Sequence, residues 1–439
     1  MLRMILVLFC YGAGTIVGLR SAVWASCFFI WSDIFRPASF ARNHGILGNP
    51  SLWMPVHIVT AVLLLSIVIK PWKRRWNGAA TAILIFCGWI FISALISKFR
   101  LVAMEKAIET SKYLIPLAII SATLCTRKAQ KLFFFTLAAS VGAWLIHHGV
   151  TTVLSGSAQI RMAIPGGQMS DRNDFMVAGT ACIPMLVYIG WSYQGAYAKW
   201  LRPALKFGTV FAVGALFYSL SRGAFLGFTA LLVWYGILTG RFFQRLPLVL
   251  LLGLVIAVTL PDVVIERMTT LKLGERQTES SAINRLEHMH TAVEVTLDFP
   301  LTGVGPAVFP HASRRYSAFT AEPHSLWLKC SAELGLPMLI FFLMLVARLL
   351  WRLNKVAGAA RLRGDKDTEH FSTALSCALV GFLATGTFTS QFMSEYMWAI
   401  IALIGAFLAT PIEQATGSEM VDGEEDAAAA QPALTAGSA

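Results

Sequence analysis

The chain has 439 residues, of which 56% are hydrophobic and only 14% are charged. Soluble globular proteins are about 45–50% apolar and about 25% charged, so this composition excludes an ordinary soluble enzyme and excludes disorder over most of the chain. The 36 Lys and Arg residues outnumber the 24 Asp and Glu residues, which gives a net charge of +12. In a membrane protein such an excess of basic residues first reports topology.

Apolar segments long enough to cross a membrane recur along the whole chain. A hydrocarbon core about 30 Å thick takes about 20 residues of α-helix. The stretch 4–34 is broken by Gly18, Leu19 and Arg20, which predicts either one bent span or two short ones. Because many spans follow it, this stretch indicates a first membrane segment and not a cleaved signal peptide. The other predicted spans are 52–70, 78–97, 110–125, 132–154, 174–192, 204–220, 223–240, 246–260, 325–350, 372–390 and 395–411. The predicted fold class is an all-α polytopic membrane protein with about twelve transmembrane helices.

Loops that are rich in Lys and Arg alternate along the chain with loops that are poor in them. This alternation predicts the direction of the spans. Cytoplasmic loops are predicted at Lys73–Arg75, at Arg127–Lys131, at Lys199–Lys206, at Arg241–Arg245 and at Arg352–Lys366. The poorer loops, predicted to be external, are 35–51, 155–173, 221–222, 261–324 and 391–394, with 98–109 as a partial exception because it carries Lys98, Arg100 and Lys106. With twelve spans, both termini are expected in the cytoplasm.

Five regions follow from this assignment. Residues 1–130 and 131–260 hold the N-terminal and central spans, 261–324 form one large external loop, 325–411 hold the C-terminal spans, and 412–439 form a tail. The tail is acidic, has no basic residue and shows no periodic apolar face, so we expect it to be disordered.

The sequence of the external loop 261–324 predicts a folded structure for it. Apolar residues recur every three or four positions between residues 283 and 297, which is typical of an amphipathic helix. Ser280 or Ser281 is a candidate cap for its start, and the glycines and prolines of 300–306 end it. We therefore expect a small helical subdomain on the outer membrane surface. The apolar positions are Ile283, Leu286, Met289, Val293 and Leu297.

Several basic residues collect on the external side, where charges beside spans invite a functional hypothesis. Arg222 lies in the turn Ser221–Arg222 between two apolar runs, which leaves almost no room for a solvated loop. It either snorkels at the interface or binds an anion. Together with Arg161 it predicts a site for a doubly charged anion such as pyrophosphate, which arginine binds in bidentate fashion. Arg267 and Arg285 lie in the long loop.

His324 lies at the entry to the next span, between Pro323 and Ser325. It is either a polar cap or a general base that works near neutral pH. Glu333 is nine residues further on, about 13 Å along a helix, which is too deep for it to orient His324 directly.

Metal chemistry is not expected. Asp365 and Asp367 have a D-x-D spacing but lie in a basic cytoplasmic loop, and Asp171 and Asp174 flank Arg172, with which local ion pairs are expected. His288 and His290 are two residues apart and face different sides of a helix. The seven cysteines lie in or beside apolar runs without any C-x-x-C pair, which is typical of buried small side chains.

Three ordered segments resemble bacterial O-antigen ligases, within the wider ligase/polymerase superfamily of membrane glycosyltransferases. The segments are Ser219–Phe225, the run from Arg285 to Gly305 that ends in Phe-Pro-Leu-Thr-Gly-Val-Gly, and Pro323–Ser325 followed by Glu333–Gly335. They are similar to the family's S-R-G, P-x-x-G-x-G and P-H-N with E-x-G, and they cover roughly residues 155–410. The first 130 residues resemble the branch that includes exosortase-associated O-glycosylation ligases. Ser325 stands where the family often has Asn, which removes any role for an amide beside the histidine.

The resemblance implies a metal-independent GT-C-type fold without a cofactor. Its members move a glycan from undecaprenyl pyrophosphate to a hydroxyl, that of lipid A–core oligosaccharide in O-antigen ligases, on the periplasmic side of the inner membrane. Carried over, Arg161 and Arg222 bind the pyrophosphate and stabilise the leaving group, His324 accepts or orients the acceptor proton, and Arg285 and Arg267 contact a phosphate or anchor the loop. The partners implied are the lipid-linked donor, the lipid A–core acceptor and membrane lipids, with no nucleic acid.

Two other functions compete with a ligase. An O-antigen polymerase or a protein O-glycosylation ligase of the same superfamily differs only in its acceptor. A polysaccharide-related transporter or flippase is a different class; transporters often show internal repeats and midplane charges, whereas this chain shows no repeat and gathers its charges at one face.

Overall fold

The structure is a computed structural model, and it describes residues 2–37, 55–69, 74–155, 162–164, 168–194, 197–219, 221–240, 276–316 and 322–410. Over these ranges the regular elements are helices and no strand is present, which confirms the all-α prediction. The helices are α1 (Leu2–Arg20), α2 (Ala22–Phe35), α3 (Pro55–Ile69), α4 (Gly78–Ile96), α5 (Arg100–Thr123), α6 (Arg127–Ser155), α7 (Arg172–Ser192), α8 (Ala198–Tyr218), α9 (Arg222–Thr239), α12 (Arg276–Asp298), α13 (Phe309–Ala312), the 3-10 helix η3 (Ser313–Arg315), α14 (Leu326–Leu334), α15 (Leu336–Arg363), α16 (Lys366–Gly386) and α17 (Glu395–Ala409).

The stretch 4–34 forms two helices and not one bent span. The chain breaks at Ser21, whose side chain accepts a hydrogen bond from the Val23 amide and so caps α2. The two helices fold back on each other, because the Tyr11 hydroxyl lies 2.8 Å from the Ser32 hydroxyl and its ring packs edge-on to Phe28. The break therefore makes a helical hairpin.

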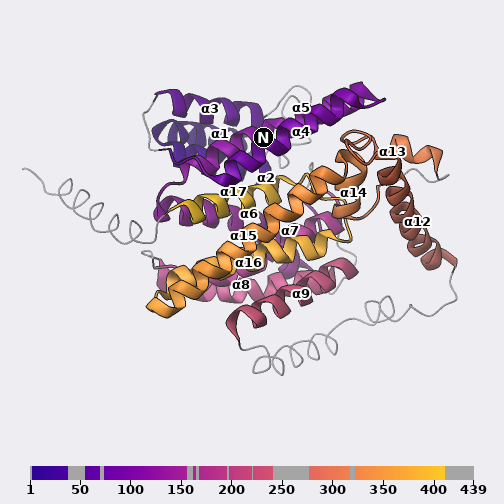
Figure 1. Cartoon of the computed structure of the whole chain (residues 1–439). Helices are drawn as coiled ribbons and strands as arrows, with labels where there is room; N and C mark the ends of the chain where they lie inside the picture. Colours follow the sequence, from indigo (N-terminus) through magenta and orange to yellow (C-terminus); the bar gives the residue numbers. More distant parts are fainter. Residues whose placement is uncertain are drawn as a thin grey trace, which may run out of the picture.

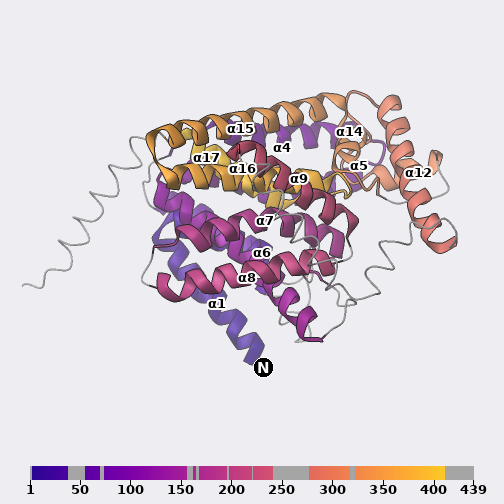
Figure 2. The same cartoon turned by 90° about the horizontal axis from the view of Figure 1, so that it is seen from below.

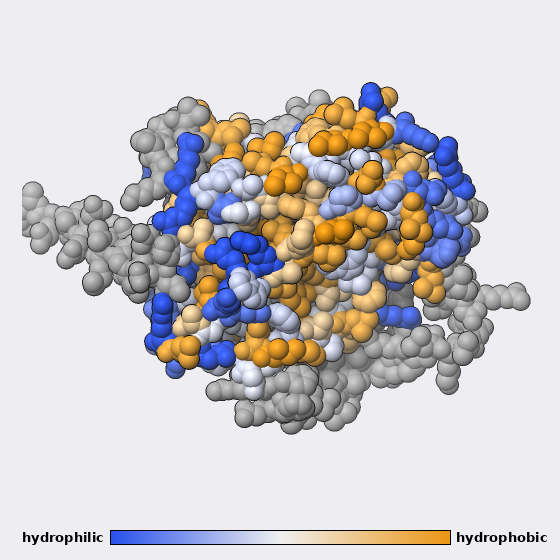
Figure 3. Space-filling view, in the orientation of Figure 1, coloured by the Kyte–Doolittle hydropathy of each residue, from blue (hydrophilic) through white to orange (hydrophobic). Residues whose placement is uncertain are grey.

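Five of the described helices are long and apolar enough to cross a membrane: α4, α6, α7, α9 and α15. The helices α2 and α17 are apolar but shorter, with 14 and 15 residues. The predicted span 246–260 lies outside the described residues, so the expected total of about twelve stays a prediction. These findings fit a multi-pass helical membrane protein, whose exposed hydrophobic surface occupies much of the face in Figure 3.

The predicted span 325–350 is wrong in its start. The chain forms the short helix α14, turns at Gly335, and only then enters the long helix α15. Gly335 has a φ of +85°, a conformation that side chains disfavour, and it brings the backbone against that of Leu301. Glu333 on α14 and His324 just before it therefore lie outside the long apolar helix α15.

The helix α17 runs through the core of the bundle. Every residue from Tyr396 to Phe407 is buried, because α2, α4, α5, α6, α15 and α16 all contact this helix. A helix that is apolar on all sides is expected in such a buried position. It fixes the start of α17 and the loop before it, which carries several residues of the candidate site.

Where the structure describes them, the two predicted sets of loops lie at opposite ends of the bundle (Figures 1 and 2). At the end with more basic residues, Arg75 donates to the Ala409 carbonyl at 2.9 Å and Lys131 pairs with Asp367 at 2.9 Å. At the other end, the Ser97 hydroxyl donates to the Val304 carbonyl at 2.6 Å. The helix α12 lies across this second end and not along the bundle (Figure 1). The candidate site is therefore gathered at one end.

Candidate functional site

The helix predicted in the long loop is present as α12, but it packs with a different face. It begins at Arg276, so Ser280 and Ser281 lie inside it and do not cap it. His288, Ala292 and Val295 are buried, whereas the predicted apolar positions Leu286, Val293 and Leu297 are exposed. Small residues allow the close approach to α14, where Thr296 and Ser331 bring their hydroxyls within 2.9 Å. The larger apolar side chains consequently point away from the bundle.

The P-x-x-G-x-G segment and the E-x-G segment interlock through their backbones. The amides of Val304 and Gly305 donate to the carbonyls of Ala332 and Glu333 at 2.9 and 3.0 Å, and the Leu336 amide donates to the Pro300 carbonyl at 2.8 Å. A Cβ on Gly303 would lie 2.3 Å from the Glu333 backbone carbon. These glycines therefore serve close backbone approach, and they join the end of α12 to the end of α14.

Glu333 has a structural place in this junction. Its side chain is fully buried, and burial raises the pKa of this carboxyl, while Lys329 one turn earlier lowers it. Lys329 itself pairs with Glu322 at 2.6 Å. The larger of the positive charges that act on Glu333 thus comes from its own helix, and Lys106 on α5 adds to it. As expected from the spacing, Glu333 lies at the opposite end of α14 from His324.

His324 occupies the other end of α14 in a strained backbone conformation. Its φ is +49°, a left-handed value that costs a non-glycine residue about 1–2 kcal/mol. Its amide donates to the Ser390 hydroxyl at 3.1 Å, which fixes the turn. Strain held in this way clusters at functional sites. The helix itself is capped by the next residue, Ser325, whose hydroxyl accepts from the Leu328 amide.

The surroundings of His324 disfavour the charged form of its imidazole. Its ring lies 6.2 Å from the ring of His288, centroid to centroid, and it is about half-buried. Burial lowers the pKa of His324 below its usual value, and the nearby charge of Arg285 and the neighbouring His288 lower it further. Arg285 itself is exposed on α12. A neutral imidazole accepts a proton, as the role of a general base requires.

Arg222 is the first residue of α9 and its side chain is exposed. Ser221 caps the helix by accepting from the Ala224 amide. The glycines that follow bring α9 close to the end of α16: a Cβ on Gly223 would lie 3.0 Å from Phe388, and one on Gly227 would lie 1.9 Å from the Thr385 hydroxyl. Arg222 therefore starts beside the same loop, 387–394, whose Ser390 holds His324.

The structure describes some of the predicted site residues and not others. His324 and Arg285 lie together where α12 packs on α14, and Arg222 starts the helix α9, which contacts α16 next to the loop that holds His324. Arg161 and Arg267 lie outside the described residues. Sequence reasoning missed Ser390 and the contact of His288 with His324. The spacing of Arg285 and His288, one helical turn apart, is the signal that puts both on one face.

Three of the four acidic residues considered as metal ligands have structural partners. Asp171 caps α7 by accepting from the Asn173 amide at 2.8 Å. Asp365 caps α16, and Asp367 accepts from the Tyr188 hydroxyl at 2.8 Å. Among the described residues no group of three or more His, Cys, Asp or Glu side chains is placed to hold a metal ion.

Known protein families cover most of the chain. A family described as O-antigen ligase matches residues 207–343, a segment that contains Arg222, Arg285, His324 and both interlocking glycine segments. This match over about a third of the chain supports the resemblance to the O-antigen ligase/polymerase superfamily. A second family, one of unknown function, matches residues 1–192, which include Arg161. No curated protein matches the chain.

Proposed function

We propose that the protein is an O-antigen ligase that transfers a glycan from undecaprenyl pyrophosphate to a hydroxyl of lipid A–core oligosaccharide, in lipopolysaccharide biosynthesis. One observation carries the proposal: His324 is strained, half-buried and held beside His288 and near the charge of Arg285, which lowers its pKa, within the segment that matches the family. Arg222 starts the helix that meets the same loop. A base and cations at one end suit transfer from a pyrophosphate.

The chemical step needs no metal and no nucleotide. The acceptor oxygen attacks the anomeric carbon, and the bond from that carbon to the pyrophosphate oxygen breaks with its electron pair going to the pyrophosphate. His324 takes the proton of the acceptor hydroxyl or orients that hydroxyl. The sugar–pyrophosphate bond supplies the energy. A GT-C-like membrane fold is part of this proposal.

The arginines have the chemistry that the leaving group demands. A guanidinium binds phosphate oxygens through two parallel hydrogen bonds, and a fixed cation stabilises charge as it develops on the pyrophosphate. We assign this role to Arg222 and to Arg161. Arg285 and Arg267 contact a phosphate or anchor the long loop; Arg285 also acts on the charge state of His324.

The proposal places the chain in the bacterial inner membrane with the His324 end in the periplasm. The exposed apolar row of α12, formed by Leu286, Val293 and Leu297, would then rest on the periplasmic surface of that membrane. Single cysteines test this in a chain without native cysteines. An impermeant maleimide should label Arg314→Cys and not Arg363→Cys in intact spheroplasts, and the opposite pattern would refute the orientation.

The lipid-linked glycan that accumulates without this protein tests the function. Loss of a ligase should leave long, polymerised chains on the lipid carrier and remove O-chains from lipopolysaccharide. Single glycan units on the carrier would instead identify a polymerase. Normal lipopolysaccharide with a missing glycoprotein would identify a protein O-glycosylation ligase. Donor that accumulates on the cytoplasmic side, with less of it in the periplasm, would identify a transporter.

A further inference from the structure

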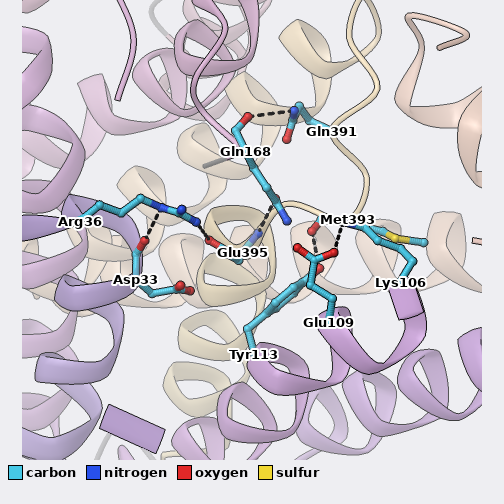
Figure 4. Close-up of polar contacts among 9 residues, drawn as sticks. All are labelled: Asp33, Arg36, Lys106, Glu109, Tyr113, Gln168, Gln391, Met393 and Glu395. Carbon is cyan, nitrogen blue, oxygen red and sulfur yellow. Dashed lines mark hydrogen bonds and ion pairs between the residues drawn. The ribbon is translucent and has the colours of Figure 1, made fainter. Parts of the chain in front are cut away.

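A second polar site lies at the same end of the bundle, where three segments distant in sequence meet. Its described lining comes from the end of α2, from Ile164, Gln168 and Met169, and from the start of α17. Figure 4 shows the side chains of Asp33, Arg36, Gln168 and Glu395 turned toward one another. None of these residues belongs to the site built around His324. The small pocket between them admits a polar group of about hydroxyl size.

Arg36 and Gln168 are fixed by hydrogen bonds to their neighbours. Arg36 has a left-handed φ of +54°; its Nε donates to the Asp33 carbonyl at 3.0 Å, and its Nη2 lies 3.5 Å from Glu395 Oε2. The side-chain oxygen of Gln168 accepts from the Glu395 amide at 3.4 Å, and its carbonyl accepts from Gln391 at 3.2 Å. The polar lining is therefore held in place before any ligand arrives.

Asp33 provides the observation that points to a ligand. Its side chain is only 3% exposed and lines the pocket, its near neighbour is the carboxyl of Glu395, and its Oδ2 receives no hydrogen bond from an N–H or hydroxyl of the described residues. A buried carboxylate oxygen without a donor is costly, and buried polar atoms nearly always have a partner. The pocket therefore calls for a donor group that the described part of the chain does not supply.

The charges of the lining select the kind of donor. A cation would be opposed by the Arg36 guanidinium, and an anion would be opposed by the carboxylates of Asp33 and Glu395. A neutral hydroxyl can donate to Asp33 Oδ2 and accept from a nearby N–H, so it suits all of these groups. Carboxylate, amide and guanidinium groups together thus favour a sugar hydroxyl or hydroxymethyl group over an ion.

Aromatic packing holds the Asp33 segment rigid. Phe35 stacks on Trp31 with ring centroids 5.6 Å apart and packs against Trp144 at 5.8 Å, and the Trp144 indole donates to the Phe35 carbonyl at 3.3 Å. Such ring pairs add to the stability that burial alone gives. The end of α2 is consequently fixed on α6, and a pre-organised carboxylate loses less entropy on binding.

The pocket is near the His324 site along the loop before α17. Ser390, which accepts from the His324 amide, and Glu395, which lines the pocket, are five residues apart. Five residues span at most about 17 Å even when fully extended. A glycan of a few sugar units that presents one hydroxyl to His324 can therefore reach the pocket with another.

We propose that the pocket of Asp33, Arg36, Gln168 and Glu395 is a glycan-binding subsite that takes a sugar hydroxyl of the acceptor oligosaccharide. The inference rests on the proposed function for its assignment to the acceptor. The pocket positions the oligosaccharide, and His324 acts on the hydroxyl that reacts. The donor glycan is the other source of the same chemistry, and the experiment separates the two.

Binding of two lipid-free glycans to the full chain in detergent tests the subsite by calorimetry. The probes are core oligosaccharide freed of lipid A and O-chain polysaccharide. Asp33→Asn, which keeps the shape but exchanges an acceptor oxygen for a donor, should weaken binding of the core oligosaccharide about tenfold, as expected for the loss of one buried hydrogen bond. Glu395→Gln should weaken it by a smaller factor. Glu109→Gln is the matched control, since Glu109 pairs with Lys106 at the protein surface (Figure 4) and should bind as the wild type does.

Each outcome decides something. A tenfold loss for O-chain polysaccharide and none for core oligosaccharide keeps the subsite but assigns it to the donor. Unchanged binding of both glycans by Asp33→Asn overturns the proposal; if that variant does not fold, unchanged binding by Glu395→Gln overturns it instead. Because binding needs no turnover, a wild-type chain that binds core oligosaccharide but transfers nothing refutes the proposed function alone. Transfer with normal glycan affinity in Asp33→Asn refutes the subsite alone.

Discussion

The two ends of α14 carry two of the sequence segments shared with the family, and they differ in almost every physical respect. At the start, His324 is half-buried, strained and surrounded by charge, with a single backbone hydrogen bond to Ser390. At the far end, Gly303 and Glu333 are joined through backbone contacts too close for a side chain. One helix therefore links a reactive end to a rigid end.

The difference teaches that a shared motif is not by itself a catalytic motif. The P-x-x-G-x-G and E-x-G segments fasten α12 to α14, and by doing so they hold His288 against the ring of His324. Changes at the reactive end should alter the rate of a folded protein, whereas changes at the rigid end should alter how much folded protein there is. Single substitutions at each end test whether rate and stability are separate in this way.

Replacement of His324 by Ala should have the largest effect. The rate of transfer from lipid-linked glycan to purified acceptor should fall about 100- to 10,000-fold, the range for a lost general acid–base group. Donor binding and the melting temperature should stay near those of the wild type, because the ring does not support the core. Transfer at the wild-type rate would remove His324 from the chemistry.

Replacement of Arg222 by Ala should act on the leaving group and on the donor together. We expect a loss of about 100-fold in rate, or roughly 3 kcal/mol of transition-state stabilisation, with weaker donor binding. Arg222→Lys should recover only part of the rate, because an ammonium cannot reproduce the planar fork of the guanidinium. Measured rate and donor affinity equal to the wild type in Arg222→Ala would exclude this residue from the site.

Replacement of Gly303 by Ala should destabilise the protein by roughly 2–5 kcal/mol. The left-handed φ of +64° and the overlap of a Cβ with the Glu333 backbone both contribute. Gly358→Ala is the control, since nothing lies within 4 Å of its Cβ position, and it should gain about 0.5–1 kcal/mol in the interior of α15. Thermal unfolding in detergent measures both. A stable Gly303→Ala protein with a lost rate would contradict the assignment of this end to structure.

The pH dependence of transfer should report the charge around His324. Its pKa is lowered by burial and by Arg285, so the neutral base persists at neutral pH and the rate should fall only as the pH drops below about 6.5. Arg285→Gln removes a charge that disfavours the imidazolium, so it should raise this pKa and move the acid limb to higher pH. Arg314→Gln, an exposed charge on η3, should leave the midpoint in place. If the midpoint of the pH profile does not move in Arg285→Gln, then Arg285 on α12 does not affect the charge state of His324.

Chelation should have the smallest effect. If arginines alone stabilise the pyrophosphate, transfer should proceed at the same rate in EDTA. A rate lost in EDTA and restored by magnesium or manganese would require metal ligands, and it would draw attention back to Asp171 and Asp174.

Sequence periodicity was sufficient for most of the helices but not for how they pack. The helix at 276–298 was predictable from its apolar repeat, yet Leu286 and Val293 point outward and His288 inward. The reason is that a membrane protein can expose large apolar residues as freely as it buries them, so hydrophobicity does not identify the packed face. Small residues such as Ala292 are the better guide, because they permit close approach.

The candidate site divides in the same way. His324 and Arg222 were predictable because each is a charge or base beside an apolar run, which is costly in lipid. Ser390 and Asp33 were not, since a serine in a loop and an aspartate at a helix end are ordinary in sequence. Only the fold brings Ser390 to the His324 amide and leaves the Asp33 carboxylate without a donor.

The outward row of α12 has a consequence for which substrate must move. If α12 lies at the lipid boundary as proposed, the bilayer holds it at a fixed depth, and with it His288 on its inner side. The imidazole it touches would then work at the level of the lipid phosphates. The lipid carrier would then reach the site by lateral diffusion without leaving the bilayer. The acceptor glycan would be the substrate that changes its conformation to reach the site.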